Sequence, residues 1–598
     1  MIFTQYYLEC LSHASYLIAD ETTGRGVVVD PQRDVAQYVA DAAAQGVTIE
    51  RVLETHVHAD FLSGHLELAE RVGATISYGD AATGIEFAYE PLADGQRLSL
   101  GTVALEIRAT PGHTPESISL VVWERPDDAT PYAVLTGDTL FIGDVGRPDL
   151  LSSIGVTADE LARRLFHSLH EQLLTLPDET RVFPAHGAGS ACGKQLSTEK
   201  QSTIGEQRLV NYALQPMTED EFVGVVTEGQ PTAPGYFAFD AARNREARPT
   251  LDEEQAPAAM HLDELLAAQS GGAAVLDTRD PMDFAAGHLR DSVNVDLQGR
   301  FSEWTGDVVD HDTHIVIVGN PGTELEAKIR LGRIGFDHVV GYLDDAHVAL
   351  ATHPEVTERS SRLTAREFEA RRRDLPDLQI LDVRNPGEVA LGAIPDARPV
   401  PLPKLIAALE TLDPDAPTVV YCAGGGRSAI GASVLAARGF ADVSDLLGGF
   451  EAWRTETAGA HPGPTANEPP RSRPVPRPPT PEPQSPDARV PEVDVAEGQR
   501  RVEAGAVLLD VRESQEWEAG HAEAAQWIPM GELAARADEI PAGRNVVVIC
   551  RSGARSGRVT EALVQAGHDA VNLAGGMQAW ASAGLPVVTE HGGPGTVA

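Results

Sequence analysis

Positive charge is scarce in this chain of 598 residues, where 47 Lys plus Arg stand against 89 Asp plus Glu and the net charge is −42. Nucleic acids and anionic membranes are bound through basic patches, so we expect neither as a partner. No basic-then-apolar N-terminus and no uninterrupted apolar run of about 18 residues occurs. We therefore expect no secretory signal and no membrane-spanning helix, and predict a cytoplasmic protein.

Cysteine is also scarce, with only Cys10, Cys192, Cys422 and Cys550 present. So few cysteines over so long a chain exclude a disulfide framework, and each thiol is a core residue, a ligand or a nucleophile. At roughly 150 residues per domain, the length predicts about four domains.

One pattern occurs three times after residue 270. Each copy begins with an apolar strand that ends in Asp and is followed by Thr-Arg or Val-Arg, at Asp277, Asp382 and Asp510. A second β-rich run follows about 40 residues later and ends at Val318, Cys422 or Cys550. Strands that alternate with helical stretches predict small parallel α/β domains of about 100 residues each.

The repeats set the predicted domain boundaries. We expect a separate domain over 1–250 and three repeats over 258–356, 360–458 and 489–588. A linker over 462–487 separates the last two repeats, and residues 462–486 contain eleven prolines. Such a segment predicts an extended spacer of about 3.1 Å per residue, up to roughly 75 Å long, that tethers the last repeat.

Two repeats place a cysteine at the start of a glycine-containing loop that leads into a predicted helix. The loops read Cys422-Ala-Gly-Gly-Gly-Arg427-Ser428 and Cys550-Arg-Ser-Gly-Ala-Arg555-Ser556. Backbone N–H groups around the sulfur, the helix N-terminus and the arginine all favour a nucleophilic thiolate. A lone cysteine at a strand end is more often a buried inert thiol, but the repetition favours catalytic roles for Cys422, Arg427, Cys550 and Arg555.

These loops resemble those of rhodanese sulfurtransferase domains, together with the Asp-Val-Arg motif, the Gly-His turn and the Gly-Gly-x-x-Ala-Trp close at 448–453 and 575–580. The resemblance implies that Cys422 and Cys550 carry sulfane sulfur as persulfides, with thiosulfate and sulfite as reactants. Both loops have the shorter Cys-x4-Arg form, whereas rhodanese-like phosphatases have one more residue. The first repeat has Val318 at the cysteine position, so we interpret it as an inactive structural or docking domain.

The N-terminal domain contains four clusters of His and Asp, each at the end of an apolar run. They are His56-Val-His58-Ala-Asp60, then His113, Asp138 and His186, beside Gly or Pro in most cases. Loops at strand ends are where the metal ligands of a layered β fold are expected. A single such residue would more often be structural, but four clusters in order favour a metal centre.

The order of these clusters resembles the metallo-β-lactamase fold over about residues 1 to 215. We therefore expect an α/β multidomain chain, with an N-terminal αββα sandwich followed by three small parallel-sheet α/β rhodanese domains. Binuclear hydrolases of this fold, including glyoxalase II thioesterases, have a further His directly after the first Asp of the motif. This sequence has Phe61 there, which weakens one of the two metal sites.

Two histidines and one carboxylate form the facial set of non-haem Fe(II) oxygenases, and His56, His113 and Asp138 supply it. This set resembles that of the persulfide dioxygenases of the ethylmalonic-encephalopathy type, which implies one Fe²⁺ per chain. His58, Asp60 and His186 are then neighbouring groups that orient the ligands. If the metal is instead Zn²⁺, as in glyoxalase II, these three residues are the alternative ligands.

Two more residues are candidate substrate-binding groups. Arg147 lies nine residues after Asp138 in a Gly-Arg-x-Asp turn, where it would orient the persulfide carrier or brace the iron loop, unless it is a surface arginine. Cys192 follows His186 by six residues and would line the pocket, with a spectator thiol as the alternative. Ala188 stands where glutathione-using members have Tyr, so glutathione, coenzyme A and other thiols stay open as carriers.

The sequence thus predicts a persulfide dioxygenase fused to sulfurtransferase domains, acting in sulfide detoxification or sulfur metabolism. Its expected substrates are a low-molecular-weight thiol persulfide, O2, and thiosulfate or sulfite. One alternative is a glyoxalase II-like zinc thioester hydrolase fused to the same domains. Another is a sulfur carrier without oxidative activity. Homo-oligomer formation is left open.

Overall fold

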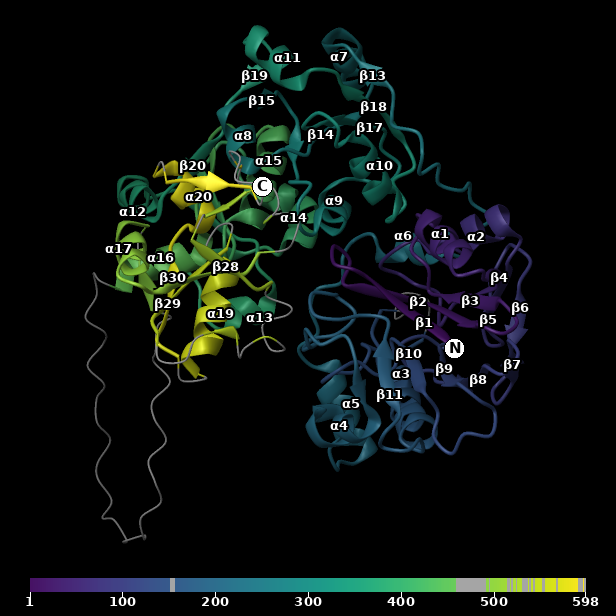
Figure 1. Cartoon of the computed structure of the whole chain (residues 1–598). Helices are drawn as coiled ribbons and strands as arrows, with labels where there is room; N and C mark the ends of the chain where they lie inside the picture. The colour runs from purple at the N-terminus through teal and green to yellow at the C-terminus, as the bar shows by residue number, and fades with distance from the viewer. Residues whose placement is uncertain are drawn as a thin grey trace, which may run out of the picture. The chain divides into compact units, whose positions relative to one another are not determined.

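The computed structural model of the chain (Figure 1) describes residues 1–150, 156–458 and 595, and residues 491–589 apart from 494, 513–516, 518–519, 523, 530–535, 537–538, 541–543, 551–553, 566–567 and 584. The predicted linker over 462–487 therefore lies outside the described residues. The chain divides into two compact units, residues 1–465 and 466–598. Among the described residues, no helix has the length and apolar character needed to cross a membrane.

The N-terminal domain contains two six-stranded sheets. The first has the order β1-β2-β3-β4-β5-β6 (Ile2–Leu8, His13–Asp20, Arg25–Val29, Thr48–Leu53, Thr75–Gly79, Glu90–Leu92). The second has the order β12-β11-β10-β9-β8-β7 (Ser202–Thr203, Arg181–Pro184, Ala133–Gly137, Ile118–Trp123, Ala104–Ala109, Arg97–Ser99). Helices α1 (Ala36–Ala44) and α2 (His65–Val72) pack on the first sheet, and α3 (Ala158–His167) and α5 (Glu219–Thr227) on the second.

Alternating apolar residues explain this four-layer arrangement. Successive strand side chains point to opposite faces, so Tyr16 and Ile18 of β2 reach the core between the sheets, while Leu17 packs against the α1 and α2 layer. In β10, Leu135 enters the same central core and Val134 faces α3. Both faces of each sheet are therefore covered, and the predicted αββα sandwich is confirmed.

The parallel strands bring the polar segments together. β3 pairs with β4 in parallel, and β10 pairs with β11 in parallel. Their carboxyl ends lead directly into Asp30, the His56 segment, Asp138 and the His186 loop. Because parallel strands end at the same edge of a sheet, these side chains gather at one edge of the sandwich.

Each of the three repeats has a five-stranded sheet with the same strand order. The first is β13-β18-β17-β14-β16 (Ala259–Met260, Val339–Leu343, Ile315–Val318, Ala274–Asp277, Val293–Asn294), and the second is β20-β24-β23-β21-β22 (Ser361–Leu363, Val443–Leu446, Thr418–Tyr421, Gln379–Asp382, Arg398–Pro399). The third is β25-β30-β29-β26-β28 (Glu492–Val493, Ala570–Leu573, Val546–Ile549, Val507–Asp510, Ala525–Trp527). All pairings within these sheets are parallel, as the repeat predicted.

The strand-ending Asp of each repeat has a structural role. Arg384 pairs with Asp382 at 2.6 Å, and its Nη2 also donates to the carbonyl of Gly392 at 2.7 Å. The same clamp recurs as Asp277 with Arg279 and as Asp510 with Arg512. A buried carboxylate is stable only when it is paired and hydrogen-bonded, so the Asp-x-Arg motif fixes the turn after the strand.

The first repeat packs against both of its neighbours in the chain. Arg33 of the N-terminal domain donates to the carbonyl of Gly332 at 2.7 Å, at the C-terminal end of helix α10 (Glu324–Gly332). On the other side, the Asn294 amide donates to Ser433 Oγ at 3.0 Å in helix α15 (Gly426–Ala437). The first repeat therefore joins the N-terminal domain to the second repeat within the first compact unit.

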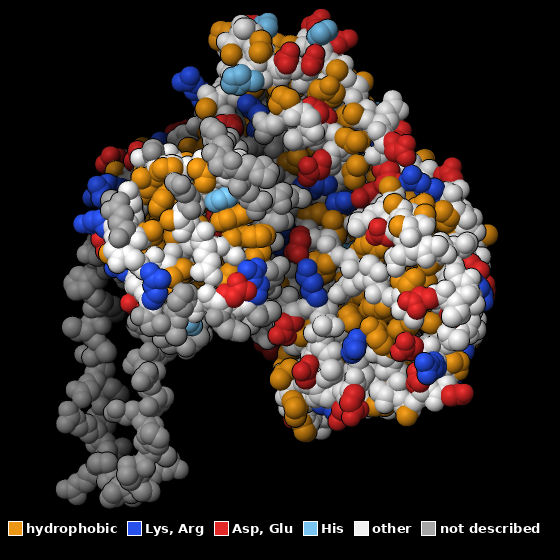
Figure 2. All heavy atoms as spheres, in the orientation of Figure 1, with side chains coloured by type: hydrophobic (Ala, Val, Ile, Leu, Met, Phe, Trp, Pro, Cys, Tyr) orange, Lys and Arg blue, Asp and Glu red, His pale blue; other side chains and the backbone are white. Residues whose placement is uncertain are grey.

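The N-terminal domain carries charged side chains of both signs on its surface. On the face drawn in Figure 2, acidic and basic side chains are interspersed over the N-terminal domain. Exposed ion pairs occur in this domain, such as Arg25 with Glu50 at 2.8 Å and Arg163 with Asp159 at 2.9 Å. Exposed pairs of this kind contribute little to stability.

Candidate metal centre and sulfur-transfer loops

Three predicted ligands converge at the sheet edge. The ligand atoms of His56, His113 and Asp138 all lie within 4.8 Å of one another, and all three residues are buried. Asp138 Oδ2 lies 3.5 Å from His113 Nε2 and 3.9 Å from His56 Nε2. Among the described residues, His56 Nε2 and Asp138 Oδ2 are buried without a hydrogen-bond partner. Buried polar atoms are normally satisfied, so unpartnered atoms that face one point fit a metal ion.

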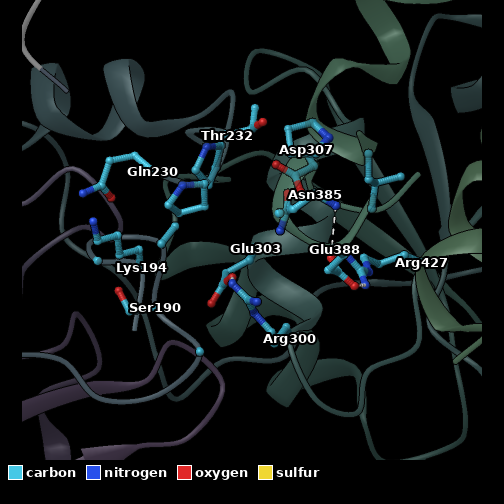
Figure 3. A pocket seen from close by; sticks show the side chains of 18 of the residues that line it. Ser190, Lys194, Gln230, Thr232, Arg300, Glu303, Asp307, Asn385, Glu388 and Arg427 are labelled. Carbon is cyan, nitrogen blue, oxygen red and sulfur yellow. Dashed lines mark hydrogen bonds and ion pairs between the residues drawn. The ribbon is translucent and has the colours of Figure 1, made fainter. Parts of the chain in front are cut away.

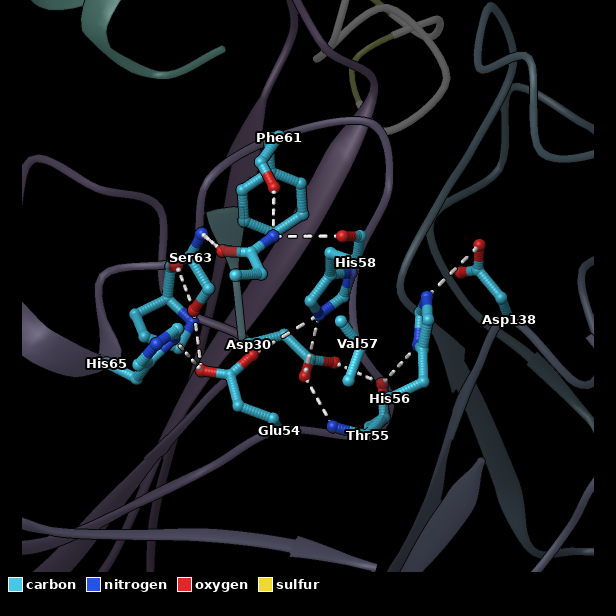
Figure 4. Close-up of polar contacts among 12 residues, drawn as sticks. Asp30, Glu54, Thr55, His56, Val57, His58, Phe61, Ser63, His65 and Asp138 are labelled. Atoms are coloured by element: carbon cyan, nitrogen blue, oxygen red, sulfur yellow. Dashed lines mark hydrogen bonds and ion pairs between the residues drawn. The ribbon is translucent and has the colours of Figure 1, made fainter. Parts of the chain in front are cut away.

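Neighbouring groups hold both histidines with Nε2 toward that point. His56 Nδ1 donates to Thr55 Oγ1 at 3.0 Å, and Thr55 Oγ1 in turn donates to Asp30 at 2.8 Å (Figure 4). His113 Nδ1 donates to the Arg147 carbonyl at 2.9 Å. Such hydrogen bonds set the tautomer and ring orientation of metal-binding histidines.

His186 lies between two carboxylates and pairs with both of them. Its Nδ1 lies 2.8 Å from Asp138 Oδ1, and its Nε2 lies 2.7 Å from Asp60 Oδ2. Burial opposes a charge on His186, but Asp138 and Asp60 outweigh it and raise the pKa of His186 well above its usual range. Cys192 adjoins the same pair, with its sulfur within 4.8 Å of the Asp60 and His186 ligand atoms. Burial and the nearby Asp60 raise the pKa of the Cys192 thiol.

The ring of His58 lies 4.1 Å from that of His56, but its Nε2 faces a separate buried cluster of carboxylates. Its Nε2 lies 3.1 Å from Asp30 Oδ1 and 3.4 Å from Glu54 Oε2 (Figure 4). Although burial opposes the charged ring, these two carboxylates raise the pKa of His58 to about 10. The ring of Phe61 lies 4.5 Å from the His58 ring. Asp60 and His186 thus pair with each other, whereas His58 pairs with Asp30 and Glu54, so the three residues do not form one group.

Three buried residues of this region escaped the sequence analysis. Asp30 and Glu54 pair with His58. The ring of His13 lies 4.1 Å from that of Phe61 at a tilt of 45°, and its Nε2 is unpartnered among the described residues. Asp30 had a usable signal, because it directly follows the apolar strand β3 at the same sheet edge. Glu54 had the same signal, since it directly follows strand β4, whereas no motif marks His13.

Arg147 is buried, so it is not a surface arginine. Its guanidinium pairs with Asp149 at 2.7 and 2.8 Å and donates to the Ala191 carbonyl at 3.0 Å. Its backbone amide also donates to the Cys192 carbonyl at 3.0 Å. These contacts join the Asp138 loop to the Cys192 loop, while the carbonyl of Arg147 accepts the hydrogen bond from His113 Nδ1.

The Cys422 loop surrounds a buried sulfur at the start of α15. The Gly425 amide donates to Cys422 Sγ at 3.1 Å, and Ser428 Oγ lies 3.6 Å from that sulfur. Gly425 has φ +101°, a conformation that favours glycine. Arg427 forms two contacts of 2.7 Å with Glu388, a partner that the sequence analysis missed.

Cys550 occupies the equivalent place in the third repeat, before helix α19 (Ala554–Gln565). Its sulfur is buried and accepts a hydrogen bond from Ser556 Oγ at 3.3 Å. The side chain of Arg555 lies outside the described residues. In the first repeat, Val318 is fully buried at the matching strand end.

Comparisons with known proteins agree with this architecture. The family model of the metallo-beta-lactamase superfamily matches residues 8–186, and that of the rhodanese-like domain matches residues 261–349, 364–456 and 494–583. The chain is 29% identical to the mitochondrial persulfide dioxygenase ETHE1 of Bos taurus over 231 residues, which are 38% of this chain and 82% of that protein.

Two further comparisons are with a curated relative and with a solved structure. A probable metallo-hydrolase of Burkholderia pseudomallei is 31% identical over 251 residues, which are 36% of this chain and 82% of that protein. A solved structure of a metallo-beta-lactamase from Staphylococcus aureus is 30% identical with a TM-score of 0.52, and the match covers 57% of this chain and 99% of that one.

Proposed function

Because the chain belongs to the metallo-β-lactamase superfamily and carries three rhodanese-like domains, we propose that it is a persulfide dioxygenase and sulfurtransferase. It oxidises a low-molecular-weight thiol persulfide, R–S–SH, with O2 and water to sulfite and the free thiol, and it passes sulfane sulfur through cysteine persulfides. The observation that carries the proposal is the convergence of His56, His113 and Asp138, while His58 pairs with Asp30 and Glu54 instead.

The proposed cofactor is one Fe²⁺ per chain, held by His56, His113 and Asp138. When bound, the iron supplies the redox chemistry with O2 and an open position for the substrate sulfur. The protein contributes geometry: Thr55 and the Arg147 carbonyl fix the two imidazoles, and the Asp60–His186 pair fixes the second oxygen of Asp138.

The second part of the proposal concerns the cysteine loops. The Cys422 sulfur attacks the outer sulfur of thiosulfate, the S–S bond breaks, and sulfite leaves with the electron pair. The Gly425 N–H stabilises the anionic sulfur. Cys550 is proposed to do the same in the third repeat, and the direction of transfer depends on the concentrations of persulfide and sulfite.

The decisive test is O2 consumption by the full-length, iron-loaded protein given a panel of persulfides. We expect O2 uptake with sulfite release, and loss of both in His113→Ala. Replacing Cys422 or Cys550 singly by Ser should remove part of the thiosulfate sulfurtransferase activity, the double replacement should remove all of it, and O2 uptake should stay in place in each variant.

A zinc thioester hydrolase is the second candidate. The probable metallo-hydrolase among the relatives favours it, as does the second group of potential ligands at Asp60, His186 and Cys192. Metal analysis separates the two: about two zinc ions per chain, with thioester hydrolysis and no O2 uptake, would contradict the dioxygenase.

A further inference from the structure

His13 is a buried histidine beside the candidate metal centre, and the proposed function gives it no role. It is the first residue of β2 and is 1% exposed. Among the described residues, its Nε2 is buried without a hydrogen-bond partner. Buried polar atoms are normally satisfied, so this free nitrogen indicates a ligand that the chain itself does not supply.

The turn before β2 holds His13 against the His186 loop. His13 and His186 form an antiparallel backbone bridge. Ser12 precedes them at φ +51°, and its carbonyl accepts a hydrogen bond from the Gly187 amide at 3.0 Å. A left-handed conformation is uncommon for residues other than glycine, so the contact with the His186 loop holds a turn that is otherwise unfavourable. His13 therefore has a fixed place next to the metal centre.

Three rings of the candidate metal centre surround the ring of His13. The ring centres lie 4.1 Å away for Phe61, 5.5 Å for His186 and 5.9 Å for His58. Phe61 and His58 belong to the segment that also contains the proposed ligand His56. The free nitrogen of His13 is therefore part of the wall of the metal centre.

Contact with a solvent-filled cavity does not account for this nitrogen. The loop that follows His186 forms one wall of a cavity of about 650 Å³ between the N-terminal domain and the first two repeats (Figure 3), with Gly189 and Ser190 in its lining. The described residues that line this cavity do not include His13. Ser12 Oγ donates to the Ala188 carbonyl at 2.8 Å, so the turn that carries His13 packs beneath that loop.

The ring of His13 is neutral. Burial lowers the pKa of His13 well below its usual range, His186 and His58 lower it further, and Asp138 opposes them only in part. A neutral imidazole has one N–H group and one lone pair. With its proton on Nε2, His13 can donate one hydrogen bond to an anion at the metal centre.

We propose that His13 donates this hydrogen bond to the inner sulfur of the persulfide, which is the sulfur attached to the carrier. The proposal rests on the proposed dioxygenase function, in which the outer sulfur takes the open metal position. The persulfide anion R–S–S⁻, O2 and water give R–S⁻, sulfite and two protons. The outer sulfur is oxidised by O2, the S–S bond breaks, and its electron pair stays on the inner sulfur.

Negative charge therefore develops on the inner sulfur as the S–S bond breaks. A donor that is already in place at a buried site stabilises such charge more in the transition state than in the bound substrate. Loss of the donor should for this reason lower kcat more than it raises KM.

The first test compares two replacements of His13 in full-length, iron-loaded protein. His13→Gln keeps an N–H donor, whereas His13→Leu removes it. We expect His13→Leu to lower kcat for O2 uptake about tenfold or more and to change KM for the persulfide less than about threefold. His13→Gln should keep both parameters within about threefold of the unaltered protein. Equal losses in the two variants, or no loss in His13→Leu, would overturn the proposal.

His65→Leu is the matched control. His65 is buried in α2, and its Nε2 is also without a hydrogen-bond partner among the described residues. Its ring, however, lies 4.8 Å from that of Phe87. We expect His65→Leu to keep kcat within about twofold of the unaltered protein. The same loss of kcat in His65→Leu as in His13→Leu would contradict a specific role for His13.

Stability separates the proposed role from a purely structural one. His13→Leu replaces an unpartnered buried N–H group by an apolar side chain of similar size, so its midpoint of urea unfolding should be no lower than that of the unaltered protein. Elemental analysis should find the same iron content in both proteins. A clearly lower midpoint would assign His13 to the fold instead. His13→Met, which also lacks a donor, replaces His13→Leu in every measurement if the leucine variant is not obtained.

The second test does not depend on oxidation. Hydrogen sulfide is a thiol without a carrier, and calorimetry under anaerobic conditions measures its binding to the full-length, metal-loaded protein. We expect binding to His13→Leu to be about tenfold weaker than binding to the unaltered protein or to His13→Gln. Equal binding to the three proteins, or no binding to any, would overturn the donor role. If the unaltered protein takes up no O2 with any persulfide, the proposed function fails, and the hydrogen sulfide result alone decides on His13.

Discussion

Arg333 of the first repeat forms two contacts of 2.7 Å with Asp34 of the N-terminal domain. Its backbone carbonyl accepts a hydrogen bond from Leu62, the residue after Phe61, at 2.7 Å. Both side chains of the ion pair are largely buried. The interface therefore holds the turn that carries Asp60 and Phe61, and the cysteine-lacking repeat supports the metal-centre loop.

Removing one partner of this pair should destabilise the first compact unit. Arg333→Ala leaves Asp34 buried without its cation, and breaking such a pair costs about 3–5 kcal/mol. Urea unfolding monitored by intrinsic fluorescence should show the loss. Arg290→Ala, at an exposed pair with Glu358, should leave the midpoint nearly unchanged; an equal effect in both variants would contradict a specific role for the buried pair.

Metal content should distinguish the ligand histidine from the ion-paired one. His113→Ala removes a proposed ligand and should lower bound iron at least about tenfold. His58→Gln removes the cation between Asp30 and Glu54, so it should lower the midpoint of unfolding but keep bound iron near one per chain. Elemental analysis of both purified variants measures bound iron per chain. Loss of iron from His58→Gln would indicate that His58 is a metal ligand.

Asp307 should make stability depend on pH. Burial raises its pKa to about 7, against the opposing influence of Arg300, the Gly235 N–H and Arg427, with Tyr236 also nearby. Between about pH 4 and 7 the folded chain keeps a proton that the unfolded chain releases, so its stability falls as pH rises through that window. Asp307→Asn removes this effect and should be more stable than its parent at pH 8, by on the order of 1–4 kcal/mol.

The same two proteins should have similar stability near pH 4, where Asp307 is protonated in both states. Thermal unfolding at pH 4, 6 and 8 measures the difference. A stability difference that stays constant across pH would mean that Asp307 titrates normally in the folded protein.

Two adjacent glycines of the Cys422 loop should respond differently to alanine. Gly425 has φ +101°, and a methyl group there would approach the Gly448 amide at 3.1 Å, whereas a methyl group at Gly424 meets nothing within 4 Å. Because the Gly425 N–H contacts Cys422 Sγ, Gly425→Ala should lower thiosulfate turnover by Cys422 more than about tenfold. Gly424→Ala should retain most of this turnover, and both variants are measured in Cys550→Ser protein. Equal turnover in the two glycine variants would mean that the loop conformation does not contribute to sulfur transfer.

The sequence predicted features that are local or periodic. The αββα sandwich and the three parallel sheets follow from apolar alternation and from the repeat, and His56, His113 and Asp138 each end a strand at one sheet edge. It did not predict the long-range partners. The pairing of His58 with Asp30, and that of Arg427 with Glu388 in helix α13 (Pro386–Ala390), join residues that are 28 and 39 positions apart. Such pairs depend on how elements pack, which no single motif encodes.

The Asp277–Arg279 clamp persists in a repeat whose strand ends in Val318 instead of cysteine. The residues that close the turn and those that would carry sulfur thus form separate sets. The first repeat accordingly keeps the strand order of the other two with a buried valine at this position. A duplicated domain of this kind can therefore change its reactive position and keep its sheet, because the Asp-Arg pair that fixes the turn is separate from the residue that would carry sulfur.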